Sequence, residues 1–75
     1  MNAAEFGKRV AELRLAKGLT QTVLAKKLNV TTQAISKWER GLGFPDVLII
    51  PQLACELETT TDYLFGCTDI KSYIG

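Results

Sequence analysis

The segment 31–40 carries its hydrogen-bonding side chains on one side of a predicted helix. At about 100° per residue, these side chains span an arc of roughly 140°, in the order Thr32, Ser36, Arg40, Gln33 and Lys37. The opposite side holds the apolar Ala34, Ile35 and Trp38. Hydroxyl, amide and cationic groups can hydrogen-bond base edges or phosphates, so the polar face indicates nucleic-acid contact. The ordinary alternative is a surface helix whose polar face meets only solvent.

Two short helices joined by a tight turn would position this face. The first is expected over about 21–28, and the second follows the turn and ends before Gly41. Asn29 tolerates the left-handed conformation found at many helix C-termini. Thr20 and Thr31 can each cap a helix with a side-chain hydroxyl. Val23 stands where a Glu would complete a capping box at the first of these helices.

The spacing of this segment resembles the Cro/repressor-type (Xre-like) helix-turn-helix proteins of phages and bacteria. The matching residues are Leu13-Arg14, Gly18-Leu19-Thr20-Gln21, Leu24-Ala25, Leu28, Val30-Thr31, Gln33, Ile35 to Gly41, Pro45-Asp46, Leu53-Ala54 and Leu57. The similarity runs from about residue 6 to residue 66. The resemblance implies an all-α fold, a compact five-helix bundle of the phage-repressor DNA-binding type. The chain departs from the family at Glu58, where the family usually has glycine.

The resemblance also implies roles for individual residues. The second helix of the motif would enter the major groove, and the base-reading residues would be Thr31, Thr32, Gln33 and Lys37. The backbone contacts would come from Thr20, Gln21, Ser36 and Arg40. Gln33 could pair with adenine, and Lys37 could donate to guanine. The family's ion pair between the first and third helices falls on Arg14 and Glu39.

The remaining helices follow from apolar spacing and capping residues. The first is expected over about 3–17, ended by Gly18, and the fifth over about 61–65, capped by Thr60. The fourth is expected over about 47–57 with Asp46 as its cap. Pro51 fits only in a first turn, so its regular part would start nearer residue 49. The predicted core is Phe6, Val10, Leu13, Leu24, Ala25, Leu28, Ile35, Trp38, Leu53, Ala54, Leu57 and Leu64.

Length and charge limit the possible organisation. Seventy-five residues allow one domain, predicted over 1–66, with a C-terminal tail over 67–75. The net charge of +1 conceals an asymmetry, because residues 1–40 carry +5 and residues 41–75 carry −4. A basic half that contains the motif favours a polyanionic partner.

The chain lacks the residues that several classes of function need. The chain has no histidine and no recognisable catalytic constellation, so we expect no enzyme, no metal and no cofactor or small-molecule ligand. The longest aliphatic run, 47–50, is far too short to span a membrane, which predicts a cytoplasmic protein. In that compartment Cys55 and Cys67 would stay reduced.

The sequence therefore predicts a sequence-specific regulator of transcription that binds duplex DNA. We expect a repressor that acts by operator occupancy as a homodimer on a near-palindromic operator. The candidate dimer surface is Tyr63 to Ile74. The alternative is a protein-interaction module with the same fold, antitoxin-like or an antagonist, which would pair through its acidic C-terminal half. The sequence leaves open whether Phe44 packs inward or reaches a partner.

Overall fold

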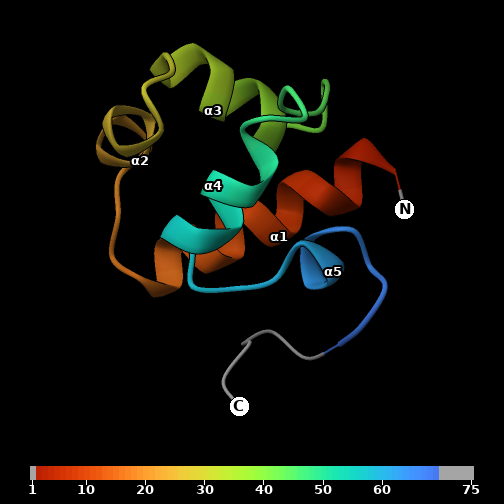
Figure 1. The fold of residues 1–75 in the computed structure, drawn as a ribbon. Coiled ribbons are helices and arrows are strands. Elements are labelled where there is room, and N and C mark those ends of the chain that lie inside the picture. The colour runs from red at the N-terminus through yellow and green to blue at the C-terminus, as the bar shows by residue number, and fades with distance from the viewer. Residues whose placement is uncertain (1, 70–75) are drawn as a thin grey trace.

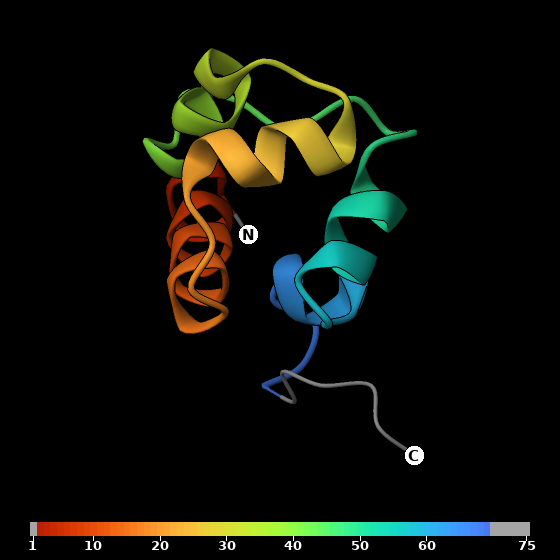
Figure 2. The ribbon, with the colours of Figure 1, turned by 90° about the vertical axis from the view of Figure 1, so that its left-hand side faces the viewer.

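The computed structural model describes residues 2–69 and contains five helices (Figure 1). They are α1 (Ala3–Ala16), α2 (Gln21–Leu28), α3 (Thr32–Glu39), α4 (Ile50–Glu56) and α5 (Thr61–Leu64). No strand is present in the described part of the chain. Helices α2 and α3 lie together at one end of the molecule, with α1 on one side below them and α4 and α5 on the other (Figure 2). The predicted all-α five-helix fold is confirmed.

Side-chain caps fix four of the helix starts, and at α1 the Asn2 side chain accepts a hydrogen bond from the Glu5 N–H at 2.8 Å. The hydroxyls of Thr20, Thr31 and Thr60 each accept a hydrogen bond from the backbone N–H three residues later, at 3.0–3.1 Å. Each bond satisfies one of the orphan N–H groups of a first turn. Asn29 ends α2 with φ at 57°, as predicted. These local signals set the turn between α2 and α3 and hence the exposed face of α3.

The fourth helix begins close to residue 49, as the position of Pro51 predicted, and not at residue 47. It starts at Ile50, and the prediction that Asp46 caps it is wrong. The Asp46 carboxylate accepts a hydrogen bond from the Leu48 N–H at 3.0 Å, so it closes a separate turn ahead of the helix. Pro51 occupies the first turn of α4, where a missing N–H breaks no helical hydrogen bond. The helix therefore starts where the proline permits.

The core matches the predicted set with one change at its edge. Eleven of the twelve predicted residues form one buried cluster, and Leu13 is only partly buried against it. Trp38 is 5% exposed, as expected for a core residue on the apolar side of α3. Tyr63 is also 5% exposed, although the sequence placed it on a contact surface. Burial of this cluster supplies the main stabilising term for so small a domain.

A glycine in the middle of α1 lets α3 approach closely. A Cβ at Gly7 would lie 2.0 Å from the carbonyl oxygen of Trp38, so no other residue fits without a backbone shift. Gly41, directly after α3, has φ at +75°, and a Cβ there would lie 2.8 Å from the Ala4 Cα. The C-terminal end of α3 is thus seated on the start of α1.

The loop after α3 is held by an aromatic contact. The Phe44 ring lies 5.2 Å from that of Phe6 and 6.0 Å from that of Phe65, measured between ring centroids. Phe44 packs inward on one side, yet 47% of it remains exposed.

No helix within residues 2–69 has the length and apolarity required to cross a membrane.

Candidate nucleic-acid interface

Helix α3 presents its polar side chains away from the core. Ile35 and Trp38 are buried beneath it, whereas Gln33, Lys37 and Arg40 are exposed. The helix lies at the outer edge of the molecule, where nothing else in the described chain covers it (Figure 1). The outward arc inferred from helical spacing is therefore an open surface with donors of the kind that DNA bases and phosphates accept.

A hydrogen-bonded network joins α1, α2 and α3 just behind this surface. Arg14 Nε donates to Glu39 Oε2 at 2.6 Å, and Arg14 Nη2 donates to Glu39 Oε1 at 3.0 Å. Gln21 Nε2 donates to the same Oε1 at 2.9 Å. Arg14 Nη1 also donates to the Leu19 carbonyl at 2.8 Å. The contact expected between Arg14 and Glu39 is present, and its geometry is bidentate.

Burial makes this network a rigid junction. The Arg14 and Glu39 side chains are only 11% and 8% exposed. Their hydrogen bonds raise the pKa of Arg14 above its ordinary value, and the nearby carboxylate charge acts in the same direction. A primary amide has two N–H groups, and Gln21 uses one of them on Glu39. Its second N–H is thus held in a fixed position at the start of α2.

The last turn of α3 has its own polar contacts. Arg40 Nε donates to Ser36 Oγ at 3.1 Å, which orients the guanidinium along the helix surface. The Lys37 side chain passes over the following loop, and its Cε lies 3.2 Å from where a Cβ at Gly43 would sit. Both cations stay exposed. These contacts leave the remaining guanidinium N–H groups and the ammonium group able to meet an anion.

Charge is distributed unevenly between the two ends of the molecule. On α2 and α3 the exposed cations are Lys26 and Lys27, together with the two at the end of α3. The one carboxylate of these helices, Glu39, is paired with Arg14. Acidic residues predominate from α4 onwards, namely Glu56, Glu58, Asp62 and Asp69. This polarity would orient the surface of α2 and α3 toward a polyanion.

The predicted site residues lie on α2 and α3 or at the caps of these helices. Thr20 and Gln21 lie at the start of α2, and Thr31 and Thr32 lie at the start of α3. The hydroxyls of Thr20 and Thr31 accept the cap hydrogen bonds, so each still has an O–H to donate. Thr32 and Ser36 are half-buried, which makes them less accessible than Gln33. No group of residues able to hold a metal ion occurs within residues 2–69.

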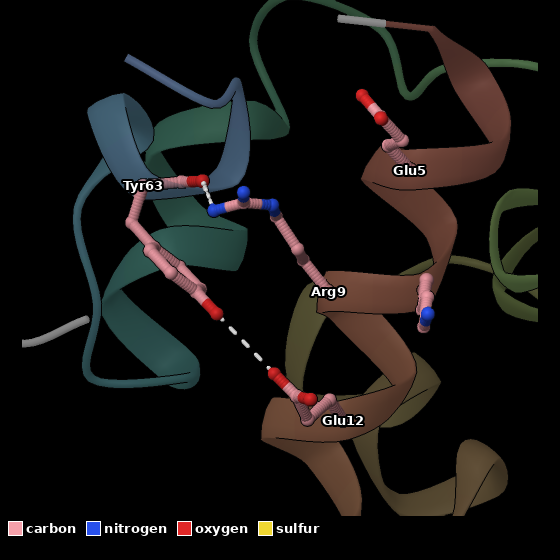
Figure 3. A pocket seen from close by; sticks show the side chains of 5 residues that line it. Glu5, Arg9, Glu12 and Tyr63 are labelled. Carbon is pink, nitrogen blue, oxygen red and sulfur yellow. Dashed lines mark hydrogen bonds between the residues drawn. The ribbon is translucent and has the colours of Figure 1, made fainter. Parts of the chain in front are cut away.

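A pocket lies between α1 and α5, and none of its lining residues comes from α2 or α3 (Figure 3). It has a volume of about 270 Å³ and is lined by Glu5, Lys8, Arg9, Glu12 and Tyr63. Arg9 Nη1 donates to the Tyr63 carbonyl at 2.8 Å, and its guanidinium lies 4.4 Å from the Tyr63 ring centroid. The Tyr63 hydroxyl donates to Glu12 at 3.2 Å. Arg9 and Glu12 thus both bind Tyr63, and these contacts hold α5 against α1. Sequence reasoning missed this contact because it joins residues more than fifty positions apart.

Comparison with known proteins identifies the family. The model of the helix-turn-helix family matches residues 10–64, which is most of the chain. The chain belongs to this family. The resemblance predicted from residues 6–66 is thereby confirmed.

Similar proteins include a curated transcriptional activator and two proteins of solved structure. The HTH-type transcriptional activator BcrR of Enterococcus faecalis is 40% identical over 62 residues, which cover 83% of this chain and 30% of BcrR. The restriction-modification controller protein C.AhdI from Aeromonas hydrophila is 35% identical, with a TM-score of 0.77 over 84% of this chain and 96% of that chain. The P22 c2 repressor, solved with a synthetic operator, is 32% identical, with a TM-score of 0.76 over 79% of this chain and 89% of the repressor chain. The chain spans about half or less of the length of BcrR and of two other curated regulators.

Proposed function

We propose that this helix-turn-helix domain binds duplex DNA sequence-specifically and represses transcription by occupying an operator. The observation that carries the proposal is the exposed polar face of α3, held by the buried network of Arg14, Glu39 and Gln21. The family assignment supports a regulator and argues against an enzyme. The P22 c2 repressor, which was solved with an operator, supports the same mode of action. We assign the activity to residues 1–66, in the cytoplasm, where a bacterial regulator reaches the chromosome.

The base-reading residues would be Thr31, Thr32, Gln33 and Lys37. Gln33 and Lys37 are both exposed on the outward arc of α3. The amide of Gln33 can bond adenine through two hydrogen bonds, and the Lys37 ammonium can donate to the O6 and N7 atoms of guanine. The two threonines offer a methyl group to a thymine methyl and a hydroxyl to a phosphate.

The DNA backbone would be held by Thr20, Gln21, Ser36 and Arg40. Glu39 accepts one N–H of Gln21 at 2.9 Å, which leaves the other to donate to a phosphate oxygen. The positive end of the α2 dipole adds to this attraction. Arg40, steered by its bond to Ser36, would contact a second phosphate near the end of α3. Such contacts set the register of α3 in the groove without reading sequence.

We also propose a homodimer on a near-palindromic operator. One helix as short as α3 reads few base pairs, and two copies about 34 Å apart on one DNA face would double the site. The surface predicted for the dimer does not hold at its start, because Tyr63 is buried against Arg9 of its own chain. Ile70, Tyr73 and Ile74 lie outside the described residues.

Selection of bound duplexes from a random DNA pool tests the proposal. The selected duplex and an unrelated duplex are then titrated with the chain between about 50 and 200 mM salt. We expect binding to the selected duplex to be at least about 1,000-fold tighter, with affinity falling as salt rises. If no sequence is enriched and no duplex is retarded even at low salt, the protein-interaction alternative replaces DNA binding.

A further inference from the structure

Gly43 differs from the other glycines of the described chain, because its backbone gives no reason for a glycine. Gly18, Gly41 and Gly66 each have a positive φ. A Cβ at Gly7 would meet the backbone at the end of α3. Gly43 has neither a positive φ nor a backbone atom in the way of a Cβ. A glycine in such a position only adds to the conformational entropy that the chain loses on folding. We therefore asked which side chain uses the space that a Cβ would fill.

The Lys37 side chain uses this space. A Cβ at Gly43 would lie 3.2 Å from Lys37 Cε and 3.9 Å from Lys37 Nζ. Apart from the residues on either side of Gly43, nothing else in the described chain comes within 4 Å of that position. Non-bonded carbon atoms pack best at about 3.5–4.0 Å. A methyl group at position 43 would thus push against the Lys37 stem, and a larger side chain would displace it.

The backbone at Gly43 is held on both sides. The Leu42 N–H donates to the Lys37 carbonyl at 3.0 Å. On the other side, the Phe44 ring centroid lies 5.2 Å from that of Phe6 in the core. Because the loop is anchored at positions 42 and 44, it cannot easily move away from Lys37. A side chain added at position 43 would therefore shift the lysine stem and not the loop.

We propose that Gly43 is a positioning residue for DNA reading, because the space it leaves open directs the Lys37 ammonium to one base pair. The inference rests on the proposed function and adds a residue that determines its specificity. The lysine stem is flexible, and fixing it on DNA costs conformational entropy. A stem that already lies over the loop loses less of this entropy. Functional groups act within about 0.5 Å of their productive positions, so a displaced stem would no longer present its ammonium to the same base.

Gly43 has no side chain of its own to offer to DNA. A substitution there can therefore change DNA binding through Lys37 or through the backbone of the loop. The two routes have different signatures. A displaced ammonium alters the preference at one base pair, whereas a lost backbone contact to phosphate weakens binding to every sequence. Base preference, measured with and without Lys37, thus separates a positioning role from a structural one.

Titrations of four variants test this inference. The variants are Gly43→Ala, Gly43→Leu, Lys37→Ala and the double variant Gly43→Leu/Lys37→Ala. Each is titrated on the duplex selected from the random pool and on duplexes in which one base pair at a time is changed. Loss of Lys37 should lower discrimination at one base pair by about fivefold or more. Gly43→Leu should remove most of the discrimination at the same base pair, and Gly43→Ala should remove less. The double variant should bind each duplex as Lys37→Ala does.

Two measurements on the free protein test the contact without DNA. Gly43→Ala should unfold at a temperature no lower than the wild type, because the backbone at position 43 lies outside the left-handed region. Nuclear magnetic resonance should show a nuclear Overhauser effect between the α protons of Gly43 and the ε protons of Lys37. A lower unfolding temperature would show that the fold itself needs this glycine. Either that result or the absence of the Overhauser effect would overturn the inference.

The titrations can overturn the inference in three further ways. If Gly43→Leu weakens binding to all duplexes by the same factor, the loop backbone contacts DNA. If Gly43→Leu has the same effect in the Lys37→Ala background, Gly43 does not act through Lys37. If Gly43→Leu leaves the base preference unchanged while the wild type remains selective, the inference alone is wrong. If the wild type selects no duplex, the proposed function fails and the inference falls with it.

Discussion

At the scale of single residues, the site depends on one buried carboxylate. Glu39 accepts two hydrogen bonds from Arg14 and one from Gln21, and its side chain is 8% exposed. The pKa of Arg14 is raised, so the stability that its charge provides is present at neutral pH and is lost only as strongly alkaline solutions pass that pKa. Raising the pH within the ordinary range therefore cannot discharge Arg14. A substitution is needed to test the network.

Replacing Glu39 should destabilise the fold more than replacing a residue of an exposed ion pair. Glu39→Gln leaves the Arg14 charge buried with a neutral partner, so we expect a loss of about 3 kcal/mol in the free energy of unfolding. The control is Glu56→Gln, because Glu56 lies 3.9 Å from Lys27 and the two side chains are 36% and 46% exposed. That change should cost less than about 1 kcal/mol. Urea unfolding measures both values, and equal losses would show that the network is not a buried junction.

At the scale of elements, two non-glycine residues of the described chain adopt a left-handed backbone conformation, each just past the end of a helix. Asn29 ends α2 with φ at 57°, and Glu58 follows α4 with φ at 54°. Asparagine tolerates this region, whereas the glutamate Cβ is strained there. Glu58 also pairs with Lys17 at the end of α1. The family usually has glycine at this position, and glycine adopts a positive φ without strain.

Substitutions at position 58 should separate strain from charge. Glu58→Ala removes the ion pair with Lys17 and keeps the strained Cβ, whereas Glu58→Gly removes both. The glycine variant should be more stable than the alanine variant by about 1 kcal/mol. Thermal unfolding of the two proteins measures the difference. An alanine variant at least as stable as the glycine variant would contradict the proposed strain.

The packing of α1 against α3 gives a second prediction at this scale. Gly7→Ala adds a Cβ that would lie 2.0 Å from the Trp38 carbonyl oxygen. The clash should outweigh the gain in helix propensity and lower the free energy of unfolding by about 1–3 kcal/mol. At Gly18, where φ is +72° and space is open, alanine should cost only about 1 kcal/mol of backbone strain. Urea unfolding compares the two variants. Increased stability of Gly7→Ala would contradict the close approach of α1 and α3.

At the scale of the whole molecule, the sequence predicted the features that depend on neighbouring residues and missed contacts between distant ones. Helical spacing and capping hydroxyls gave the positions of four helices to within a residue, because each signal lies within a few positions of the element it sets. Asp46 was misread because a carboxylate before a helix can close a turn instead of capping. The contact of Arg9 with Tyr63 and the need for Gly7 depend on residues distant in sequence. Single-sequence patterns contain no signal for such contacts.

The core seats α3 on α1, and the network at Glu39 holds the start of α2 beside it. The exposed charges of α2 and α3, the helices that carry this surface, are cations, whereas acidic residues predominate from α4 onwards. The central claim is that this surface reads bases through the outward arc of α3 and holds phosphates at its end.

Paired titrations of Gln33→Ala and Arg40→Ala test that claim most directly. Each variant is titrated on the selected operator and on unrelated duplex at several salt concentrations. Loss of Gln33 should cost about 1–3 kcal/mol on the operator and relax selectivity at one base pair. Loss of Arg40 should weaken binding to all sequences about equally and reduce the salt slope by roughly one unit per site. If both variants lower operator and unrelated affinity by the same factor, Gln33 contacts the backbone and the reading face is misplaced. If neither changes binding, the outward arc of α3 does not meet DNA.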